Sequence, residues 1–251
     1  MVMQMAPILL VALLIDGLFG RWRPGWLREA RFDRIRQAML AAVTQSVPSP
    51  GMARAFSVAA LGVGVVAALS LDLLVTMALP VPALWSIALA ALAIGMKRLS
   101  FEGHAVADGL RETPEAALDS VRRFTGDGNA TPSPDEITAL TTGALADRMA
   151  RDVLTPALAL LVLGLPGLLV SLAIRLLRDP ALDGPNDAAW AATRLDALFT
   201  WPARWITCAL LARLEPDPGD ASQPIHIEAR MEALWKLWLG LLALAAILSF
   251  L

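Results

Sequence analysis

The sequence predicts an all-α, polytopic membrane protein with about five spans and amphipathic cytoplasmic helices. Apolar residues make up 57% of the 251 residues and charged residues 18%, whereas a soluble globular domain has about 45–50% and about 25%. The apolar residues gather in long Ala/Leu/Val runs separated by short charged segments, a pattern typical of helices that cross a bilayer. The net charge of −2 does not favour a nucleic-acid partner.

The long apolar runs are expected to form the spans, because a hydrocarbon core of about 30 Å requires roughly 20 apolar residues in a helix. The segment Ser46–Gly51 predicts a break before one run, and Pro80–Pro82 predicts a tight turn after it. We expect spans at about Ala6–Phe19, Ala55–Leu79, from the turn to Met96, Val153–Leu177 and Leu234–Leu251, with Trp190–Leu214, broken at Pro202, wholly or partly in the membrane.

Basic segments predict which side faces the cytoplasm. Arginines crowd positions 21–36 after the first run, and Lys97-Arg98 follows the third; cytoplasmic loops carry such an excess of Lys and Arg. Residues 27–43 keep a helical apolar period, which favours an amphipathic helix on the membrane surface. The first run lacks the basic start and the cleavage site of a signal peptide. We therefore expect a retained first span and a multi-pass protein of a bacterial-type cell inner membrane.

Residues 99–151 form the largest polar block and are expected to be a cytoplasmic helical segment. The pattern predicts a helix over Phe101–Phe124 with a break at Pro114, a loop over Thr125–Pro134, and a helix over Glu136–Arg151 capped by Ser133 or Asp135. Both helices carry apolar stripes, so they should pack on the membrane helices. With Glu215–Pro224 as an exposed linker, residues 1–251 are interpreted as a single domain.

Two spans are irregular and carry the most informative residues. Asp16 lies inside the short first span, and Pro156 and Pro166-Gly167 interrupt the fourth, which predicts a kinked or re-entrant helix. Charges at membrane depth usually pair with one another or line a polar cavity. The only cysteine, Cys208, lies in an apolar stretch and is expected to be a small buried residue.

Arginines flank this proline-interrupted half of the chain, at Arg175, Arg178, Arg194 and Arg204. One interpretation is snorkelling side chains and an interfacial ion pair. The other is an anion-binding surface, because guanidinium groups suit phosphate and carboxylate. The sequence contains no phosphate-binding glycine loop, HExxH, CxxC or GxSxG, and no metal site is predicted. His104 is either an ordinary surface residue or a general base.

Several segments, in order and spacing, resemble the CobD/CbiB superfamily of membrane proteins. They are Asp16–Gly20, Ser100–Asp127, Pro156–Gly167 (PALALLVLGLPG), Trp190–Ala209 (WAATRLDALFTWPARWITCA) and Ile225–Leu251. The last long segment is similar to the family's tryptophan, ARLDD and proline–x–arginine pattern. The family's ENT-x-DG and NTLDS motifs fall on Asp147–Asp152 and Arg175–Asp179, with different residues, and the second aspartate of ARLDD is Ala197.

The resemblance implies a step of cobalamin biosynthesis: aminopropanol or its phosphate is attached to a carboxylate of cobyric acid, giving cobinamide or its phosphate. Such an adenosylcobinamide-phosphate synthase uses ATP and Mg²⁺, and its partners would be a corrinoid substrate and other proteins of the pathway. The residues that keep the family pattern are His104, Asp127 and Asp196 as catalytic groups, and Arg123, Arg194 and Arg204 as substrate-binding groups.

A second branch of the superfamily, AmpE, offers a non-catalytic alternative. It is an inner-membrane protein linked to signalling around β-lactamase induction, and it keeps the spans and the proline–x–arginine corner without the synthase motifs. This chain is similar to it in the basic helix after the first span and in an arginine at Arg151. The histidine-containing motifs of the synthases, after the first span and before the last, have no counterpart here. An enzyme and a membrane scaffold therefore remain as alternatives.

Overall fold

The computed structural model describes residues 2–19, 49–78, 82–113, 117–118, 120–122, 134–178, 190–211 and 224–250. Every regular element within these ranges is a helix, so the all-α prediction is confirmed for the part of the chain described. The elements are α1 (Val2–Phe19), α3 (Pro50–Ala78), α4 (Pro82–Ala93), α5 (Met96–Glu112), α7 (Pro134–Met149), the π-helix η2 (Ala150–Leu154), α8 (Thr155–Leu177), α9 (Trp190–Leu211) and α10 (Pro224–Phe250).

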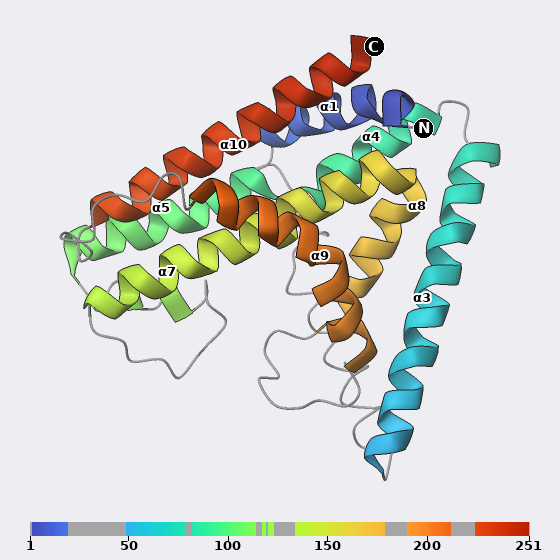
Figure 1. Ribbon diagram of the computed structural model, residues 1–251, viewed down its shortest axis with the longest axis horizontal. Coiled ribbons are helices and arrows are strands. Elements are labelled where there is room, and N and C mark those ends of the chain that lie inside the picture. Colours follow the sequence, from blue (N-terminus) through green and yellow to red (C-terminus); the bar gives the residue numbers. More distant parts are fainter. Residues whose placement is uncertain are drawn as a thin grey trace.

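The helices form two groups that run in different directions (Figure 1). In the first group α1 packs against α4 and α10, and α10 also packs against α5 and α7. In the second group α3 packs against α8 and α9 at one edge of the molecule. The main core lies where the first group meets the first half of α8: Leu9, Leu13, Met96, Leu160 and Met231 are buried together.

α3 differs from the other helices in that its apolar side chains face outward. Gly51–Ala78 and Glu136–Arg175 are the two helical segments, within the described residues, that are long and apolar enough to cross a membrane. The most apolar window of the first is only 17% buried, against 61% for the second. Met52, Phe56, Val63 and Met77 are among the exposed side chains of α3. A helix of a soluble core would bury such residues.

Two helix starts follow from local chemistry. Ser49 accepts the backbone N–H of Met52 on its side chain at 3.4 Å, and Pro50 occupies the first helical position, where its missing N–H has no partner to lose. The expected break Ser46–Gly51 therefore ends at Ser49. Asp16 accepts the backbone N–H of Met96 at 3.0 Å, so a buried carboxylate from α1 stabilises the start of α5. This contact explains an acidic residue inside the first apolar helix.

Several predicted boundaries are wrong. α4 has 12 residues, or about 18 Å at about 1.5 Å per residue, because the chain leaves the helix at Ile94 and Gly95 before α5 begins. α9 continues through Pro202 instead of breaking there. Asp135 lies inside α7, which starts at Pro134, and so it is not the cap. Cys208 is exposed, not buried. The five-span prediction stays a prediction, because two helical segments of the described residues are long and apolar enough to cross a membrane.

Other predictions hold or fall outside the described residues. α5 ends at Glu112 because Thr113 is extended, with φ −154° and ψ 148°, as the residue before a proline prefers; this confirms the break at Pro114. α10 begins at Pro224, ten residues before the expected last span. The expected surface helix 27–43 and most of the linker 215–224 lie outside the described residues, as does the expected loop Thr125–Pro134 except for Pro134, which begins α7.

The predicted kink in the fourth apolar run is confirmed. The bend is larger than a kink, because α8 reverses direction. Gly164 has φ 73° and ψ −159°, a backbone conformation that is essentially restricted to glycine. Asp152, just before α8, and Arg175, near its end, lie 3.3 Å apart between Oδ1 and Nη2. In a straight helix at about 1.5 Å per residue they would lie about 35 Å apart. The reversal therefore returns the end of α8 to its beginning.

Candidate functional site: an arginine–aspartate cluster

The π-helix η2 is the element on which the site is built. Its wider turn leaves carbonyl groups free for partners outside the ordinary helical ladder, and such turns are frequent at functional sites. The Thr155 hydroxyl donates to the carbonyl oxygen of Ala150 at 2.8 Å. The carbonyl oxygen of Asp152 accepts the N–H of Gly95 at 3.3 Å, at the gap between α4 and α5. These two bonds fix η2 where Arg151 and Asp152 project from it.

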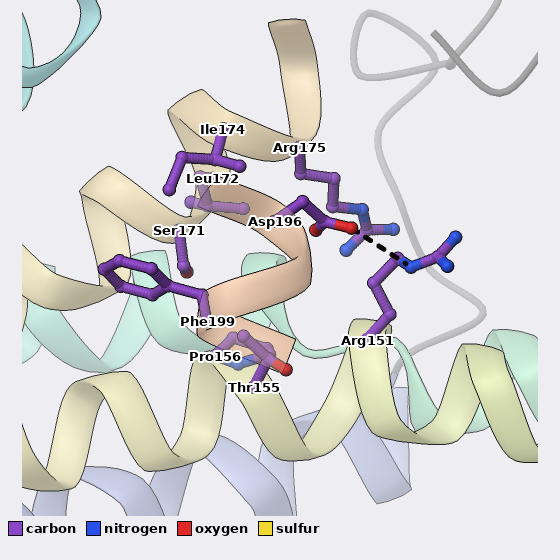
Figure 2. Close-up of a pocket in the computed structure, with 9 residues that line it drawn as sticks. All are labelled: Arg151, Thr155, Pro156, Ser171, Leu172, Ile174, Arg175, Asp196 and Phe199. Carbon is purple, nitrogen blue, oxygen red and sulfur yellow. Dashed lines mark ion pairs between the residues drawn. The ribbon is translucent and has the colours of Figure 1, made fainter. Parts of the chain in front are cut away.

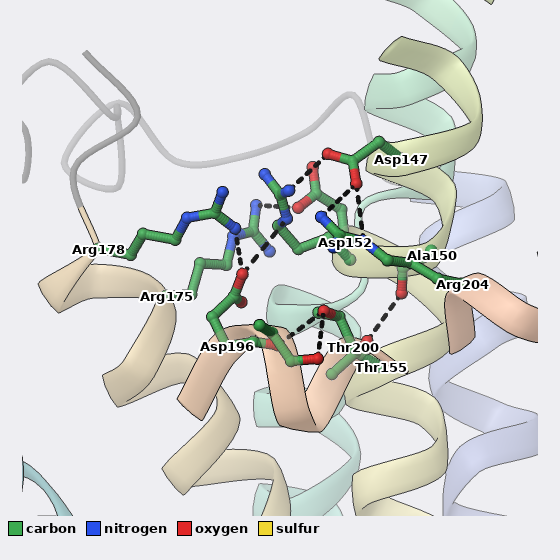
Figure 3. Close-up of polar contacts among 11 residues, drawn as sticks. Asp147, Ala150, Asp152, Thr155, Arg175, Arg178, Asp196, Thr200 and Arg204 are labelled. Atoms are coloured by element: carbon green, nitrogen blue, oxygen red, sulfur yellow. Dashed lines mark hydrogen bonds and ion pairs between the residues drawn. The ribbon is translucent and has the colours of Figure 1, made fainter. Parts of the chain in front are cut away.

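Charged side chains from η2, α7, α8 and α9 meet around this turn (Figure 3). We call them the arginine–aspartate cluster; its members are Asp147, Arg151, Asp152, Arg175, Arg178, Asp196 and Arg204. Four arginines face three aspartates, so the cluster has a formal net charge of +1. Its members come from segments that the α8 reversal and the packing of α9 bring together.

Asp147 joins two of the arginines at the more exposed edge. Its Oδ1 accepts hydrogen bonds from the Nε of Arg204 at 3.0 Å and from its Nη2 at 2.7 Å. Its Oδ2 lies 2.5 Å from the Nη2 of Arg151. The side chains of Asp147 and Arg204 remain 37% and 42% exposed. This carboxylate therefore connects α7, η2 and α9 at a position that water still reaches.

Asp196 is the buried member of the cluster. Its side chain is 7% exposed and accepts a hydrogen bond from Arg178. Its Oδ2 also lies 3.6 Å from the Nε of Arg151, which is too long for a hydrogen bond. That Nε is buried and has no hydrogen-bond partner among the described residues. Asp196 thus faces two cations, one of them with unused donor capacity.

A small pocket lies behind Asp196, between the two halves of α8 and α9 (Figure 2). Thr155 and Pro156 line it from the first half of α8, Ser171 from the second half, and Phe199 from α9. It has room for about one water molecule. A larger ligand would therefore bind at the exposed edge of the cluster, beside Asp147 and Arg204, and not inside this pocket.

The arrangement can hold an anion more readily than a metal ion. Guanidinium groups present several N–H donors in a plane, and they bind phosphate and carboxylate in pairs of hydrogen bonds. Magnesium prefers carboxylate and water oxygens in an octahedron. No group of three or more metal-ligating side chains occurs within the described residues, and each aspartate of the cluster already faces an arginine. The carboxylates therefore do not fit the Mg²⁺ that a synthase would use.

The structure brings some of the sequence-predicted site residues together in the cluster and places others elsewhere. Asp196 and Arg204 belong to the cluster. His104 lies exposed on α5, where its Nδ1 is 2.7 Å from the carbonyl oxygen of Ser100, and it takes no part in the cluster. Arg194 is on an exposed face of α9, also outside the cluster. Arg123 and Asp127 lie outside the described residues.

Three members of the cluster were missed as site residues: Asp147, Arg151 and Asp152. A signal for the first two existed, because Asp147 and Arg151 stand four positions apart, and such residues are neighbours on a helix. Nothing in the sequence indicated that Arg175 would return to Asp152.

Two members of the cluster come from a segment that resembles the family, and the other five fall on positions where the family's motifs are changed. Asp147, Arg151 and Asp152 fall on the ENT-x-DG position, and Arg175 and Arg178 on the NTLDS position. The remaining two members come from the ARLDD-like segment and from the proline–x–arginine corner of α9. Comparison of the whole chain with protein families, with curated proteins and with solved structures finds no match.

Proposed function

We propose that this chain is a membrane protein of cobalamin biosynthesis that attaches aminopropanol or its phosphate to a carboxylate of cobyric acid. One observation carries the proposal: Asp196 and Arg204, from the segment that resembles CobD/CbiB proteins, lie in one cluster with residues at the positions of the family's ENT-x-DG and NTLDS motifs, although those motifs are changed here. The chemistry of the cluster then has to suit the reaction.

The arginines suit the anionic parts of that reaction. Aminopropanol phosphate carries a phosphate, and ATP, which drives amide formation in the family, carries three. Fixed guanidinium groups bind such groups with charge-assisted hydrogen bonds and stabilise charge that develops during transfer. Arg204 and Arg175, with side chains 42% and 33% exposed, are the members best placed to contact a ligand. We assign no step to Mg²⁺, since the aspartates do not fit it.

Membrane placement is supported by the surface of α3. Its apolar side chains point outward, and lipid tails would cover them without the cost of apolar surface in water. α1, α4 and α10 supply further apolar segments. We propose a multi-pass protein of the cell inner membrane with about five membrane segments. A corrinoid substrate or proteins of the pathway would bind on its cytoplasmic side.

A specific observation favours a second candidate, a non-catalytic AmpE-like scaffold of the inner membrane. In the cluster each carboxylate is neutralised by arginine, and the pocket behind Asp196 has room for only about one water molecule. Such a network could serve to hold α7, α8 and α9 together. In that case the arginines would stabilise the fold, and no small-molecule substrate would be turned over.

The deciding experiment is a coupling assay on the protein purified in detergent. ATP-dependent joining of aminopropanol phosphate to adenosylcobyric acid is measured, together with binding of the corrinoid. Turnover supports the enzyme. Absence of both turnover and corrinoid binding would refute it and leave the scaffold. The genes beside this one give an inexpensive check: corrinoid genes favour the first function and cell-wall amidase genes the second.

A matched pair of variants tests whether the cluster is the site. Arg204→Ala removes an arginine from the exposed edge of the cluster, and Arg148→Ala removes one that pairs with Glu102 at 2.6 Å elsewhere on α7. If the cluster binds substrate, the first variant should lose about tenfold or more in kcat/KM, as expected when about 1.4 kcal/mol of binding to a charged group is lost. The second should keep its activity. Equal activity of the two variants would remove Arg204 from the site.

A further inference from the structure

Asp147 is held in the way that a bound phosphate or carboxylate would be held. Arg204 donates two hydrogen bonds to one of its oxygens, and Arg151 approaches the other at 2.5 Å. Pairs of guanidinium groups bind anionic ligands with this pattern. We propose that Asp147 is an internal anion that occupies the phosphate-binding position between Arg151 and Arg204, and that a phosphate-bearing ligand must displace it. The inference rests on the anion site of the proposed function and adds a means of controlling it.

Exposure distinguishes Asp147 from the other aspartates of the cluster. Its side chain is 37% exposed, whereas those of Asp152 and Asp196 are 18% and 7% exposed. Ion pairs that water reaches contribute little to stability, because solvent screens them. Asp147 can therefore exchange its arginines for water, while Asp196, held by Arg178, stays in place. The displaceable carboxylate lies at the edge where a ligand would arrive.

Charge favours the exchange. A phosphate monoester carries about −1.5 to −2 charges at neutral pH and three acceptor oxygens, against one charge and two oxygens for Asp147. Arg151 and Arg204 come from η2 and α9, so rotation of the Asp147 side chain leaves the backbone positions of both arginines unchanged. A ligand phosphate can thus take over the contacts of Asp147.

The test compares two substitutions that remove the same charge. Asp147→Asn removes the proposed competitor, and Asp152→Asn removes a carboxylate that pairs with Arg175 elsewhere in the cluster. Inorganic phosphate is titrated into the full chain, in a detergent without phosphate groups and at constant ionic strength, by isothermal titration calorimetry. We expect Asp147→Asn to bind phosphate about tenfold more tightly than the wild type, and Asp152→Asn to change affinity about threefold or less. Adding Arg204→Gln to Asp147→Asn should abolish the gain.

Three results would overturn the inference: an equal gain in both asparagine variants, no gain in Asp147→Asn, or no phosphate binding by any variant. The first would indicate a general effect of net charge. Asp147→Ser carries the same test if the asparagine variant does not purify as a folded, monodisperse protein. Because the titration uses phosphate alone, it is independent of the coupling assay. Tighter phosphate binding without turnover would overturn the enzyme and leave the displaceable aspartate standing.

Discussion

Replacing Gly164 by alanine should destabilise the protein through the backbone alone. Gly164 is the one residue with positive φ among those the structure describes. Its φ of 73° and ψ of −159° lie in a region that a residue with a Cβ atom occupies at a cost of about 1–3 kcal/mol. An alanine must therefore either accept this strain or adopt helical angles and straighten α8.

The magnitude can be bounded from the two outcomes. If alanine accepts the strain, the free energy of unfolding falls by about 1–3 kcal/mol, and α8 keeps its reversal. If α8 straightens, the contact between Asp152 and Arg175 at 3.3 Å is lost, together with the packing of the second half of α8 on α3. The loss would then exceed the strain energy, because the structure reached is not the native one.

Unfolding by SDS in mixed micelles, followed by circular dichroism, measures this loss. Gly143→Ala is the matched control, since Gly143 lies in α7 and a Cβ atom there would meet nothing within 4 Å. Alanine at an open helical position should leave stability unchanged or raise it by up to about 1 kcal/mol. If Gly164→Ala proves as stable as Gly143→Ala, the reversal of α8 does not depend on a glycine conformation.

Three further predictions concern the contacts that hold α3, α8 and α9 together. Ser57→Ala should lower the free energy of unfolding by about 1–2 kcal/mol, because the Ser57 hydroxyl accepts the N–H of Ala191 at 3.0 Å in a buried position at the start of α9; the same SDS titration measures it. Asp196→Ala should lower it by about 1.5–3 kcal/mol, because two arginines lose their buried carboxylate. Cysteines at Gly64 and Ala173 should form a disulfide on mild oxidation, because a Cβ atom at Gly64 would lie 3.4 Å from that of Ala173, close to the spacing of about 3.5–4.5 Å in disulfides; a mobility shift in non-reducing gels detects it.

Each of these predictions has a control. The exposed Ser70 of α3 should tolerate alanine with little change, and Ser57→Ala behaving like it would contradict the capping contact. Asp108, which is exposed on α5, serves in the same way for Asp196. The disulfide test requires Cys208→Ala as the background, because Cys208 is exposed. Cysteines at Gly62 and Ala173 should not react, since a Cβ atom at Gly62 meets nothing within 4 Å.

Local signals in the sequence predict most of the helices, and some of their ends. Ser49-Pro50 begins α3 with a side-chain cap followed by a proline that has no N–H to satisfy. Pro114 ends α5 because the preceding residue must be extended. These effects depend only on neighbouring residues. The early end of α4 at Ala93 does not, since it involves Asp152 from a distant segment, whose carbonyl oxygen binds Gly95.

The sequence indicates some residues of the cluster but not the partners that they contact. The family-like segment of α9 pointed to Asp196 and Arg204, and the interest of Arg175 and Arg178 as an anion-binding pair was visible from their charge. Their partners were not, because the apolar run around Gly164 is compatible with a straight, kinked or reversed helix, and periodicity does not distinguish these. A proline in the run predicts a bend but gives no direction for it.

The contact between the two ends of α8 affects how membrane crossings of the chain are counted. Asp152 and Arg175 are in contact, whereas the two surfaces of a bilayer are separated by about 30 Å of hydrocarbon. If α8 lies in a bilayer, its two ends are on the same side of it, and this apolar run contributes an even number of crossings. In that case, a topology that counts α8 as one crossing would place α9 and α10 on the opposite side of the bilayer.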